Sequence, residues 1–392
     1  LRFLDSFLSL DSDNGIIHCG AGVSLDAVLR IAILNQLFVP VLPGSKFVTV
    51  GGAIAADVHG KNHHIAGSFC DHLVGFNLLL SSGEAVYCSE SENTDLFHAS
   101  CGGMGLTGII LDAKLKLQNV PGVFINRQSI VSENLVSTFE ILEENNTSTY
   151  SVAWLDCLAQ GESLGRSIIF LGNHASNPKF EINIRRGINV PATTPSFLLN
   201  KYSMSLFNSS YFNFKKLLHK SDTVDYDSYF FPLDNIGNWN RLYGRNGFLQ
   251  YQFVVPSETA LKSITEVLEK VSAAGKGSFL SVLKKFGKAN KNWLSFPQEG
   301  YTLTLDFKRE KSLFPLLDKL DEIILKHGGR LYLAKDARMA ESTFKQSYPN
   351  WEKFLELKKS IDPENIFGSL QSDRIGLTGE KDRKKNKDGK KA

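Results

Sequence analysis

The chain has 392 residues, of which 42% are hydrophobic and 22% charged, the composition of a soluble folded protein with two or three domains. Its formal net charge of +3 does not indicate a nucleic-acid-binding protein. No segment offers ~18 uninterrupted apolar residues, so the sequence predicts no transmembrane helix.

Five cysteines are spread along the chain without a Cys-x-x-Cys pair. An odd number at wide spacing disfavours a disulfide framework or a zinc ribbon. We therefore predict a reducing compartment, with each cysteine a small buried side chain rather than a nucleophile. The five are Cys19, Cys70, Cys88, Cys101 and Cys157.

The first 44 residues predict a series of short elements. Residues 15–23 (GIIHCGAGV) indicate a strand that enters a turn, and Ser24 is the predicted N-cap of the helix that follows. Residues 39–44 (VPVLPG) predict a strand and turn punctuated by prolines. Because the chain opens at Leu1 without a Met, we expect it to begin partway through a domain.

Residues 73–117 predict mainly strands. FNLLLSSGEAVYC indicates a hairpin around Ser82-Gly83, and GIILDAKLKL is a long alternating strand. Between them, residues 95–101 predict a short helix that runs into residues 102–108. Four glycines in those seven residues predict a loop whose backbone lies tightly against a neighbour or a ligand.

Residues 123–329 are richer in aromatic residues, with the alternating strands SVAWLDCL, SIIFLG, LQYQFVVP and YTLTLDF. Amphipathic helices are predicted at 257–273 and 311–327, so this part should be a sheet backed by helices. A last helix at 351–361 stops before Asp362-Pro363. The basic end, KDRKKNKDGKKA, predicts a solvated disordered tail, with contact to an anionic membrane or a protein as the alternative.

The stretch TVGGAIAADVHGKNHH combines small residues with three histidines. His59 and His63 stand four apart, as in helical zinc sites, but Gly60 and Asn62 disfavour a helix and no Glu is in place as a base. Two other interpretations are an anion cradle to which Lys61 adds charge, and a surface turn with incidental histidines. The glycines and alanines before the first histidine favour close backbone packing.

Extended to PGSKFVTVGGAIAADVHGKNHHIAGSF, this stretch, with GGMGLTGIIL and DPENIFGS, resembles the flavoprotein oxidoreductases of the vanillyl-alcohol-oxidase/PCMH type. PLDNIGNWNRLYG, GFLQYQFVVP, LKKFG, LSFP, LDFKRE and GGRLYLAKDAR are similar to the decaprenylphosphoryl-β-D-ribose 2′-oxidase family, the flavin subunits of a ribose-to-arabinose epimerase. The resemblance covers residues 15–372 in order. It implies an α+β fold, with a PCMH-type FAD-binding domain and an inserted α+β substrate domain.

The same resemblance implies a division of the chain. Residues 1–122 are the first part of the FAD-binding domain, and residues 123–329 are the inserted substrate or cap domain. Residues 330–372 return to the FAD domain, and residues 373–392 form the basic disordered tail. Relatives carry a further small lobe ahead of the position of Leu1, with a loop that grips the FAD diphosphate, so we expect the first domain to be N-terminally incomplete.

FAD is the cofactor that the resemblance implies, with no metal. Glycines that allow close approach and backbone N–H groups that meet a diphosphate suit this cofactor. The implied contacts are Gly44, Thr49, Val50, Gly51 and Gly52 at the diphosphate and isoalloxazine, Ala56, Asp57, Val58 and His59 along the flavin, Ile110 on the adenine side and Tyr332 at the ring.

Oxidation of a secondary alcohol by flavin needs a hydride acceptor and a group that takes the hydroxyl proton. Lys335, in LYLAKDAR, matches the family lysine at the reactive edge of the flavin, where it is a base or a cation. Gln250 and Gln252 alternate across Tyr251 and therefore face the same side of a strand. The implied catalytic set is Lys335, Gln250, Gln252, Lys284 and His59, with Lys61 behind it.

A lipid-linked substrate predicts an open apolar approach with cationic groups at its mouth. The candidates are Trp239, Tyr243, Trp293 and Phe296 for the approach and Lys284, Lys285 and Lys288 for the mouth. The alternative for the four aromatic residues is that they belong to the core.

The predicted reaction is FAD-dependent oxidation of a sugar secondary alcohol to a keto-sugar. The favoured substrate is the 2′-hydroxyl of a polyprenyl-phosphate-linked ribose, as the first half of an epimerisation that a short-chain NAD(P)H-dependent reductase completes. The alternatives are an aldonolactone or alditol oxidase on a soluble sugar and an inactive flavin-binding remnant. We expect a cytoplasmic protein with no nucleic-acid partner, and peripheral contact with the inner membrane as a further expectation.

Overall fold

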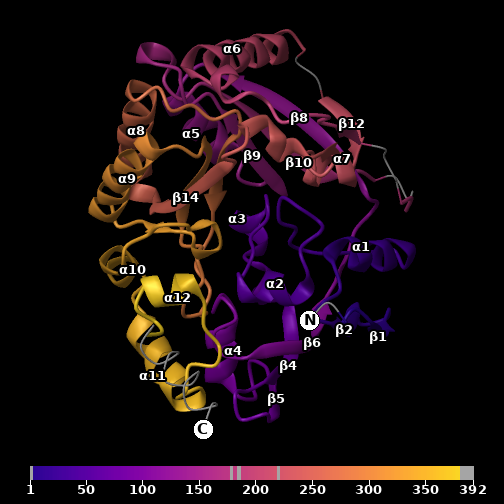
Figure 1. Ribbon diagram of the computed structural model, residues 1–392. Coiled ribbons are helices and arrows are strands. Elements are labelled where there is room, and N and C mark those ends of the chain that lie inside the picture. Colours follow the sequence, from indigo (N-terminus) through magenta and orange to yellow (C-terminus); the bar gives the residue numbers. More distant parts are fainter. Residues whose placement is uncertain (1–2, 177–179, 183–186, 219–220, 380–392) are drawn as a thin grey trace.

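The computed structural model describes residues 3–176, 180–182, 187–218 and 221–379 (Figure 1). Two antiparallel sheets dominate, with strand orders β1-β2-β6-β4-β5 and β12-β8-β10-β9-β15-β16-β14-β17. In Figure 1 the smaller sheet occupies the lower half and the larger sheet the upper half, with α2 and α3 between them. The mixed architecture agrees with the predicted α+β class.

The smaller sheet is built from strands that lie within the first 122 residues. Ser24 caps the first helix, and its hydroxyl accepts a hydrogen bond from Ala27 N at 3.3 Å. The predicted hairpin is confirmed, because Leu80 N donates to Glu84 O across the turn. The elements are β1 (Phe7–Asp11), β2 (Ile16–Gly20), α1 (Leu25–Leu34), α2 (Val50–Ala55), α3 (His63–Ala66), β4 (Leu73–Leu79), β5 (Ala85–Cys88), α4 (Thr94–Ser100) and β6 (Ile109–Lys116).

The strand expected at residues 39–44 is wrong. The extended pairing ends earlier, where β3 (Leu37–Phe38) pairs with β7 (Gln118–Asn119), and the prolines after it leave an irregular segment. All five cysteines are free and buried, which confirms their predicted role as small core side chains.

The larger sheet confirms the four strands predicted between residues 123 and 329. The helix at 257–273 is found with those bounds, whereas the next one begins at Phe314 because residues 311–313 form a 3₁₀ turn ahead of it. The strands are β8 (Phe124–Ser132), β9 (Tyr150–Leu155), β10 (Ser167–His174), β12 (Ser221–Asp225), β14 (Phe248–Pro256), β15 (Ser281–Phe286), β16 (Gly300–Lys308) and β17 (Arg330–Leu331).

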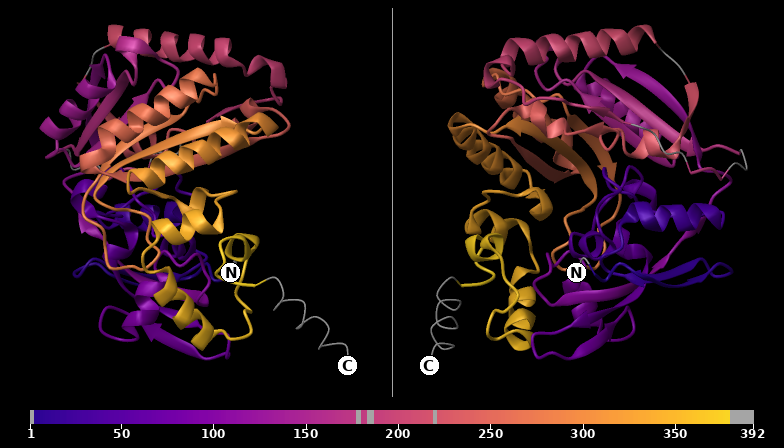
Figure 2. Two further views of the ribbon diagram at one scale, coloured as in Figure 1. Left: turned by 90° about the vertical axis from the view of Figure 1, so that its left-hand side faces the viewer. Right: turned by 45° about the vertical axis from the view of Figure 1, so that its right-hand side comes forward.

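Helices cover both faces of this sheet. One face carries the large hydrophobic core beneath α5 (Leu135–Glu144), α8 (Ser257–Ala273) and α9 (Phe314–Lys326) (Figure 2). On the other face lies α6 (Lys201–Leu217), which the sequence did not predict, with Phe212 packed against Trp154 and Ile168. The short elements α7 (Tyr226–Phe230), β11 (Ile188–Asn189) and β13 (Ile236–Gly237) complete this part.

The C-terminal segment does not return directly to the smaller domain at residue 330. Its first element, β17, is the edge strand of the larger sheet, and Leu331 belongs to the core of that sheet. The return comes later, where Lys353 pairs with Asp95 at 3.2 Å. The helices are α10 (Glu341–Ser347), α11 (Trp351–Ile361) and α12 (Leu370–Arg374).

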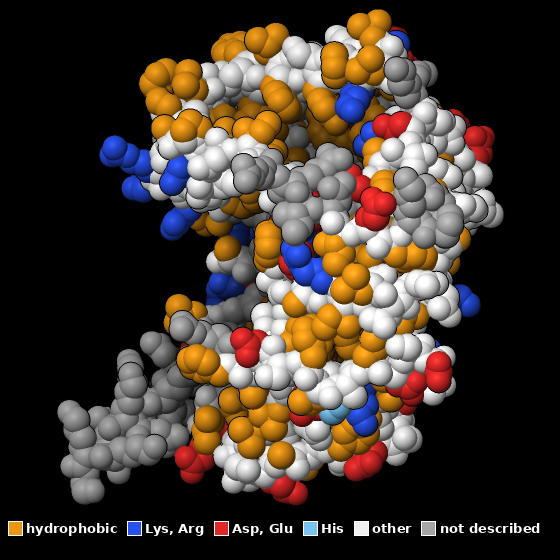
Figure 3. All heavy atoms as spheres, turned by 90° about the vertical axis from the view of Figure 1, so that its right-hand side faces the viewer, with side chains coloured by type: hydrophobic (Ala, Val, Ile, Leu, Met, Phe, Trp, Pro, Cys, Tyr) orange, Lys and Arg blue, Asp and Glu red, His pale blue; other side chains and the backbone are white. Residues whose placement is uncertain are grey.

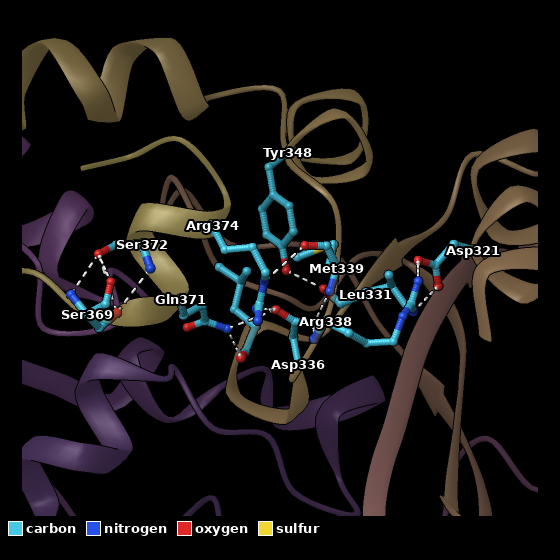
Figure 4. Close-up of polar contacts among 11 residues, drawn as sticks. Asp321, Leu331, Asp336, Arg338, Met339, Tyr348, Ser369, Gln371, Ser372 and Arg374 are labelled. Atoms are coloured by element: carbon cyan, nitrogen blue, oxygen red, sulfur yellow. Dashed lines mark hydrogen bonds and ion pairs between the residues drawn. The ribbon is translucent and has the colours of Figure 1, made fainter. Parts of the chain in front are cut away.

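The tail predicted from residue 373 also begins too early. Ile375 and Leu377 are 2% exposed and belong to the core, so the folded chain continues to residue 379. Residues 380–392 lie outside the described residues. Figure 4 shows that Arg374 and Gln371 both donate to the Asp336 carboxylate, which ties α12 to the turn after β17.

Candidate active site

The first turn of α2 is tied to the neighbouring chain. Val50 N donates to Val23 O and Gly51 N donates to Ala21 O, both at 2.8 Å. Val50 is fully buried, and a Cβ on Gly51 would lie 2.9 Å from the Ala21 Cβ. The prediction that these two N–H groups meet a diphosphate is therefore wrong, because both already have protein acceptors.

The opposite face of α2 is open. A Cβ on Gly52 would meet only Thr49 Oγ1 at 3.1 Å, and one on Gly44 would meet nothing within 4 Å. Gly44, Thr49 and Gly52 are all exposed. The Gly52 N–H already donates a hydrogen bond to Thr49 Oγ1. This smooth, uncovered backbone fits a large flat group such as the flavin, which would lie against it without displacing side chains.

The C-terminal end of α2 contacts two distant segments. Met104 N, in the glycine-rich loop, donates to Ala55 O at 2.8 Å, so α2 is the close neighbour that this loop was predicted to have. The Tyr332 hydroxyl donates to Ala56 O at 3.0 Å from the other side. Ile110, however, is 7% exposed and lies in the core of the smaller domain, which leaves little surface for the predicted adenine contact.

Asp57 is not a flavin-facing residue. It is fully buried at φ 39°, and its Oδ1 accepts from Cys70 N at 3.0 Å. Its Oδ2 accepts from Asn290, Asn292 and Ser295 at 2.7, 3.0 and 2.6 Å. The carboxylate therefore joins the smaller domain to the segment between β15 and β16, which corrects its predicted place along the flavin. The neighbouring Val58 is also nearly buried, at 9% exposed.

His59 is the centre of the polar site. Its Nε2 lies 2.9 Å from the Gln252 amide nitrogen on β14, and its Nδ1 lies 3.3 Å from Lys284 Nζ on β15. The ring is walled by Phe286 and Tyr332, with centroids 4.7 and 5.6 Å away. The structure thus brings together three predicted catalytic residues and the predicted flavin-facing tyrosine.

A second polar group lies further along the same face of the sheet. The Gln250 amide donates to Asp306 Oδ1 at 2.7 Å. Lys335 stands opposite, at the exposed end of the turn after β17, and shares one cavity with Gln250 and Gln252. The alternation of β14 predicted that both glutamines face this side, and the structure confirms it.

Asp306 is the functional candidate that the sequence analysis missed. It is 1% exposed, and its Oδ2 has no hydrogen-bond partner among the described residues, which is costly for a buried carboxylate. Asp306 lies in the LDFKRE stretch, two residues after Thr304, so strand alternation places both on the same face of β16. Asp306 also pairs with Gln250 across the strands, and this position could have indicated it.

The electrostatics of the site favour neutral groups. Burial, followed by the charge of Lys284, lowers the pKa of His59 well below its usual range, so the imidazole is neutral. Burial and the charge of Lys335 lower the pKa of Lys284 to about 8. Burial raises the pKa of Asp306 to about 6, against the Gln250 hydrogen bond. Although exposed, Lys335 also has a lowered pKa, because surrounding protein desolvates it while Asp306 opposes the shift.

Lys61 lies away from His59. Its ammonium donates to Tyr229 O and lies 4.4 Å from the centre of the Tyr229 ring. Burial, then the charge of Lys284, lowers its pKa to about 7. His63 likewise has a partner of its own, Gly287 N at 3.1 Å, and among the described residues no group of acidic, His or Cys side chains is placed to hold a metal ion.

The predicted apolar approach is largely wrong. Tyr243, Phe296 and Trp293 are at most 5% exposed and belong to the core, which was the stated alternative. Lys285 points to the other face of the sheet and pairs with Glu143 at 2.5 Å, because adjacent residues of a strand face opposite sides. Of these candidates, Trp239 is partly exposed and Lys288 is exposed.

Comparisons with known proteins give the class of this chain. A family model described as an FAD binding domain matches residues 1–89, and one described as D-arabinono-1,4-lactone oxidase matches residues 248–375. Together with the open face of α2 and the polar site beside it, these matches define an FAD-dependent oxidoreductase.

Three relatives are similar over almost the whole chain. The decaprenylphosphoryl-β-D-ribose oxidase of Mycolicibacterium smegmatis is 36% identical over 386 residues, 95% of this chain and 84% of that protein. An uncharacterised protein of Streptomyces coelicolor is 32% identical over 91% of this chain and 100% of its own length. Mouse L-gulonolactone oxidase is 24% identical over 93% of this chain and 82% of its own. The chain belongs to the family of the decaprenylphosphoryl-β-D-ribose oxidase, and FAD is its cofactor.

Proposed function

We propose that this protein oxidises the 2′-hydroxyl of a polyprenyl-phosphate-linked ribose to a ketone. The observation that supports this most directly is the 36% identity to a decaprenylphosphoryl-β-D-ribose oxidase over 95% of the chain. Bound FAD supplies the hydride acceptor. The residues proposed to hold it are Gly44, Thr49, Gly52 and Ala56 on the open side of α2, His59, and Tyr332.

The sugar is proposed to lie against the polar face of the larger sheet. Gln252 and neutral His59 offer hydrogen-bond donors and acceptors there, and Gln250 with Asp306 continues the polar surface. The polar groups would orient the ring so that the 2′ C–H faces the flavin and the hydroxyl faces a base.

Lys335 is the proposed base. Burial lowers its pKa below the ordinary value of a lysine, so the neutral amine is easier to reach, and a neutral amine can take the hydroxyl proton as the C–H bond breaks. With bound FAD as the hydride acceptor, Lys335 would take the hydroxyl proton and the carbinol carbon would become a ketone. Lys284 also has a lowered pKa, and its place beside His59 suits a positioning residue.

The product keto-sugar needs a second step, a reduction of the ketone, if the pathway is an epimerisation. We propose a separate short-chain NAD(P)H-dependent reductase as the partner for this step. Among the described residues, no helix is long and apolar enough to cross a membrane.

The test compares substrates on one preparation of the FAD-loaded enzyme. Polyprenyl-phospho-ribose should bleach the flavin anaerobically far faster than gulono- or galactono-lactone. The lactone oxidase model that matches residues 248–375, and the likeness to L-gulonolactone oxidase, make a lactone the serious alternative. Faster bleaching by either lactone would transfer the assignment to a lactone oxidase, and bleaching by neither class would remove both.

A further inference from the structure

Lys335 has no side-chain anchor of its own. Among the described residues, none accepts a hydrogen bond from its ammonium group or forms an ion pair with it. The groups that face it from other elements, Asp306 on β16, Lys284 on β15 and His59, act on it through charge alone. The place of the ammonium group is therefore set by the backbone of residues 333–339, which we call the lysine turn.

The lysine turn is organised around the carboxylate of Asp336. Its Oδ1 accepts from the backbone N–H groups of Arg338 and Met339 at 2.8 and 2.6 Å. Its Oδ2 accepts from Gln371 Nε2 at 3.2 Å and from Arg374 Nη2, both on α12 (Figure 4). Together these donors fill the roughly four lone-pair sites of a carboxylate. Asp336 therefore has no acceptor site left for the lysine beside it in the chain.

Helix α12 holds the lysine turn at two further points. Arg374 Nε donates to Met339 O at 3.1 Å, and Gln371 Nε2 donates to Leu333 O at 2.7 Å. The Arg374 guanidinium thus bridges two acceptors of the turn, Asp336 and Met339, which the point charge of a lysine would not do.

A second arginine fixes the lysine turn from the side of the large core. Arg338 donates to both oxygens of Asp321 on α9, at 3.1 and 2.7 Å. The Tyr251 hydroxyl donates to the same carboxylate at 2.9 Å. Tyr251 stands between Gln250 and Gln252, so this contact relates the turn to the strand of the two glutamines. The turn is held by β14 and α9 on one side and by α12 on the other.

We propose that Arg374 is a positioning residue for Lys335. It occupies the Asp336 carboxylate, holds the lysine turn in place and keeps the lysine available to the cavity that it shares with the two glutamines. Without this guanidinium, Asp336 would have an open acceptor site next to Lys335 and would draw the ammonium group toward it. The turn would also lose the contact between α12 and Met339. The inference rests on the proposed role of Lys335 as the base.

The test variant is Arg374→Met, and Arg30→Met on α1 is the matched control. Each change removes a partly exposed arginine, 31 and 40% exposed, from an ion pair with an aspartate. Helix α1 lies at the right of Figure 1, away from α12, and Figure 3 shows that side of the molecule, where acidic and basic side chains are scattered. Flavin stoichiometry and the melting temperature report whether each variant is folded. Should Arg374→Met fail to fold, Gln371→Met, which removes only a neutral donor to the turn, takes its place.

The first readout is anaerobic flavin reduction in the FAD-loaded enzyme, with whichever sugar substrate reduces the unchanged enzyme faster. In Arg374→Met the limiting rate should fall at least about tenfold, because a misplacement of about 1 Å can cost ~10²-fold, while the apparent Kd of the substrate changes less than about threefold. Arg374→Lys keeps a charged donor for Asp336 and should recover part of the rate. Arg30→Met should keep the unchanged rate.

The second readout does not use turnover. Competitive acetylation of the FAD-loaded enzyme with acetic anhydride, followed by peptide mass spectrometry, measures how the reactivity of the Lys335 amine depends on pH. Burial lowers the pKa of Lys335 in the folded protein, and a looser turn and an open carboxylate would both raise it. The midpoint of labelling should therefore move to higher pH in Arg374→Met and stay unchanged in Arg30→Met.

Two results would overturn the inference. One is an unchanged limiting rate together with an unchanged labelling midpoint in Arg374→Met, and the other is an equal change of both in Arg30→Met. Failure of the proposed function is seen separately. If Lys335→Ala reduces the flavin at the unchanged rate, the proposed base is lost, and the labelling midpoint still decides whether Arg374 positions the lysine.

Discussion

The Gln252 amide nitrogen lies 2.9 Å from His59 Nε2, although 193 residues separate them in the chain. Lys284 Nζ approaches the other ring nitrogen at 3.3 Å. An ammonium group can only donate hydrogen bonds, so when Lys284 is charged, His59 Nδ1 must accept from it. The proton of the neutral imidazole is then on Nε2. The Gln252 amide would have to rotate so that its oxygen accepts from Nε2. The protonation of Lys284 therefore decides the tautomer of His59.

Lys284→Met should raise the pKa of His59. The Lys284 charge is the second cause that lowers this pKa, and burial, the first, would remain. The histidine should therefore titrate at a higher pH than in the unchanged protein, yet still below its ordinary value. NMR of histidine-labelled protein measures this shift. Lys285→Met is the matched control, because that lysine pairs with Glu143 on the opposite face. An equal shift in both variants would show that Lys284 has no special influence on the ring.

Lys335→Ala should leave FAD bound and slow flavin reduction by substrate about 10²–10⁴-fold, the usual contribution of a positioned base. Anaerobic stopped-flow bleaching measures the rate, and the absorbance before mixing measures bound flavin. Lys262→Ala, an exposed lysine on α8, controls for the loss of one surface charge. Bleaching at the unchanged rate in the Lys335 variant would remove this residue from the mechanism.

Gly52→Val should abolish FAD retention, because a branched side chain would fill the open face of α2. Gly52→Ala separates cofactor contact from folding. In a helix this change stabilises by roughly 0.5–1 kcal/mol, so the apo protein should melt no lower than the unchanged chain, while flavin binding weakens. Flavin stoichiometry and apo melting temperature are the two readouts. Full stoichiometry in the valine variant would place the cofactor elsewhere.

Asp57→Ala should destabilise the fold by about 3–5 kcal/mol, because it leaves several buried donors without their acceptor. Urea unfolding measures the change. Asp57→Asn keeps one oxygen acceptor and should therefore lose less stability than Asp57→Ala. A variant that unfolds like the unchanged chain but no longer holds FAD would reinstate the flavin contact predicted from sequence.

Asp306→Asn should stabilise the protein above pH 6 and have little effect near pH 4. The folded pKa of about 6 exceeds the reference value of 3.8, so the folded state keeps its proton longer than the unfolded state as the pH rises. The penalty of the buried carboxylate is therefore full above pH 6 and disappears as the pH falls to 3.8. The gain should be on the order of 3 kcal/mol.

Melting temperatures across this pH range test the Asp306 prediction, with exposed Asp95→Asn as the control. A gain in melting temperature that does not change with pH would mean that the ionised carboxylate is not what destabilises the fold. A loss of stability above pH 6 would mean that ionised Asp306 is well paired in the fold.

The sequence by itself determined the elements whose pattern is local. Ser24 marks the start of α1, the apolar periodicity of residues 257–273 gives the bounds of α8, and the alternation of β14 places Gln250 and Gln252 on one face. Each of these depends on residues a few positions apart. The family motifs added FAD as the cofactor, which the comparisons confirm.

Only the tertiary structure decided which side chains meet across long separations. Asp57 stands among residues that resemble a flavin site, yet its partners come from residues 290–295, and this pairing buries it. Helix α6 was missed because apolar residues occur on nearly all its sides and Ser, Asn and Phe favour a helix weakly. Its buried side is defined by contact with Trp154, 58 positions before Phe212, which no local pattern records.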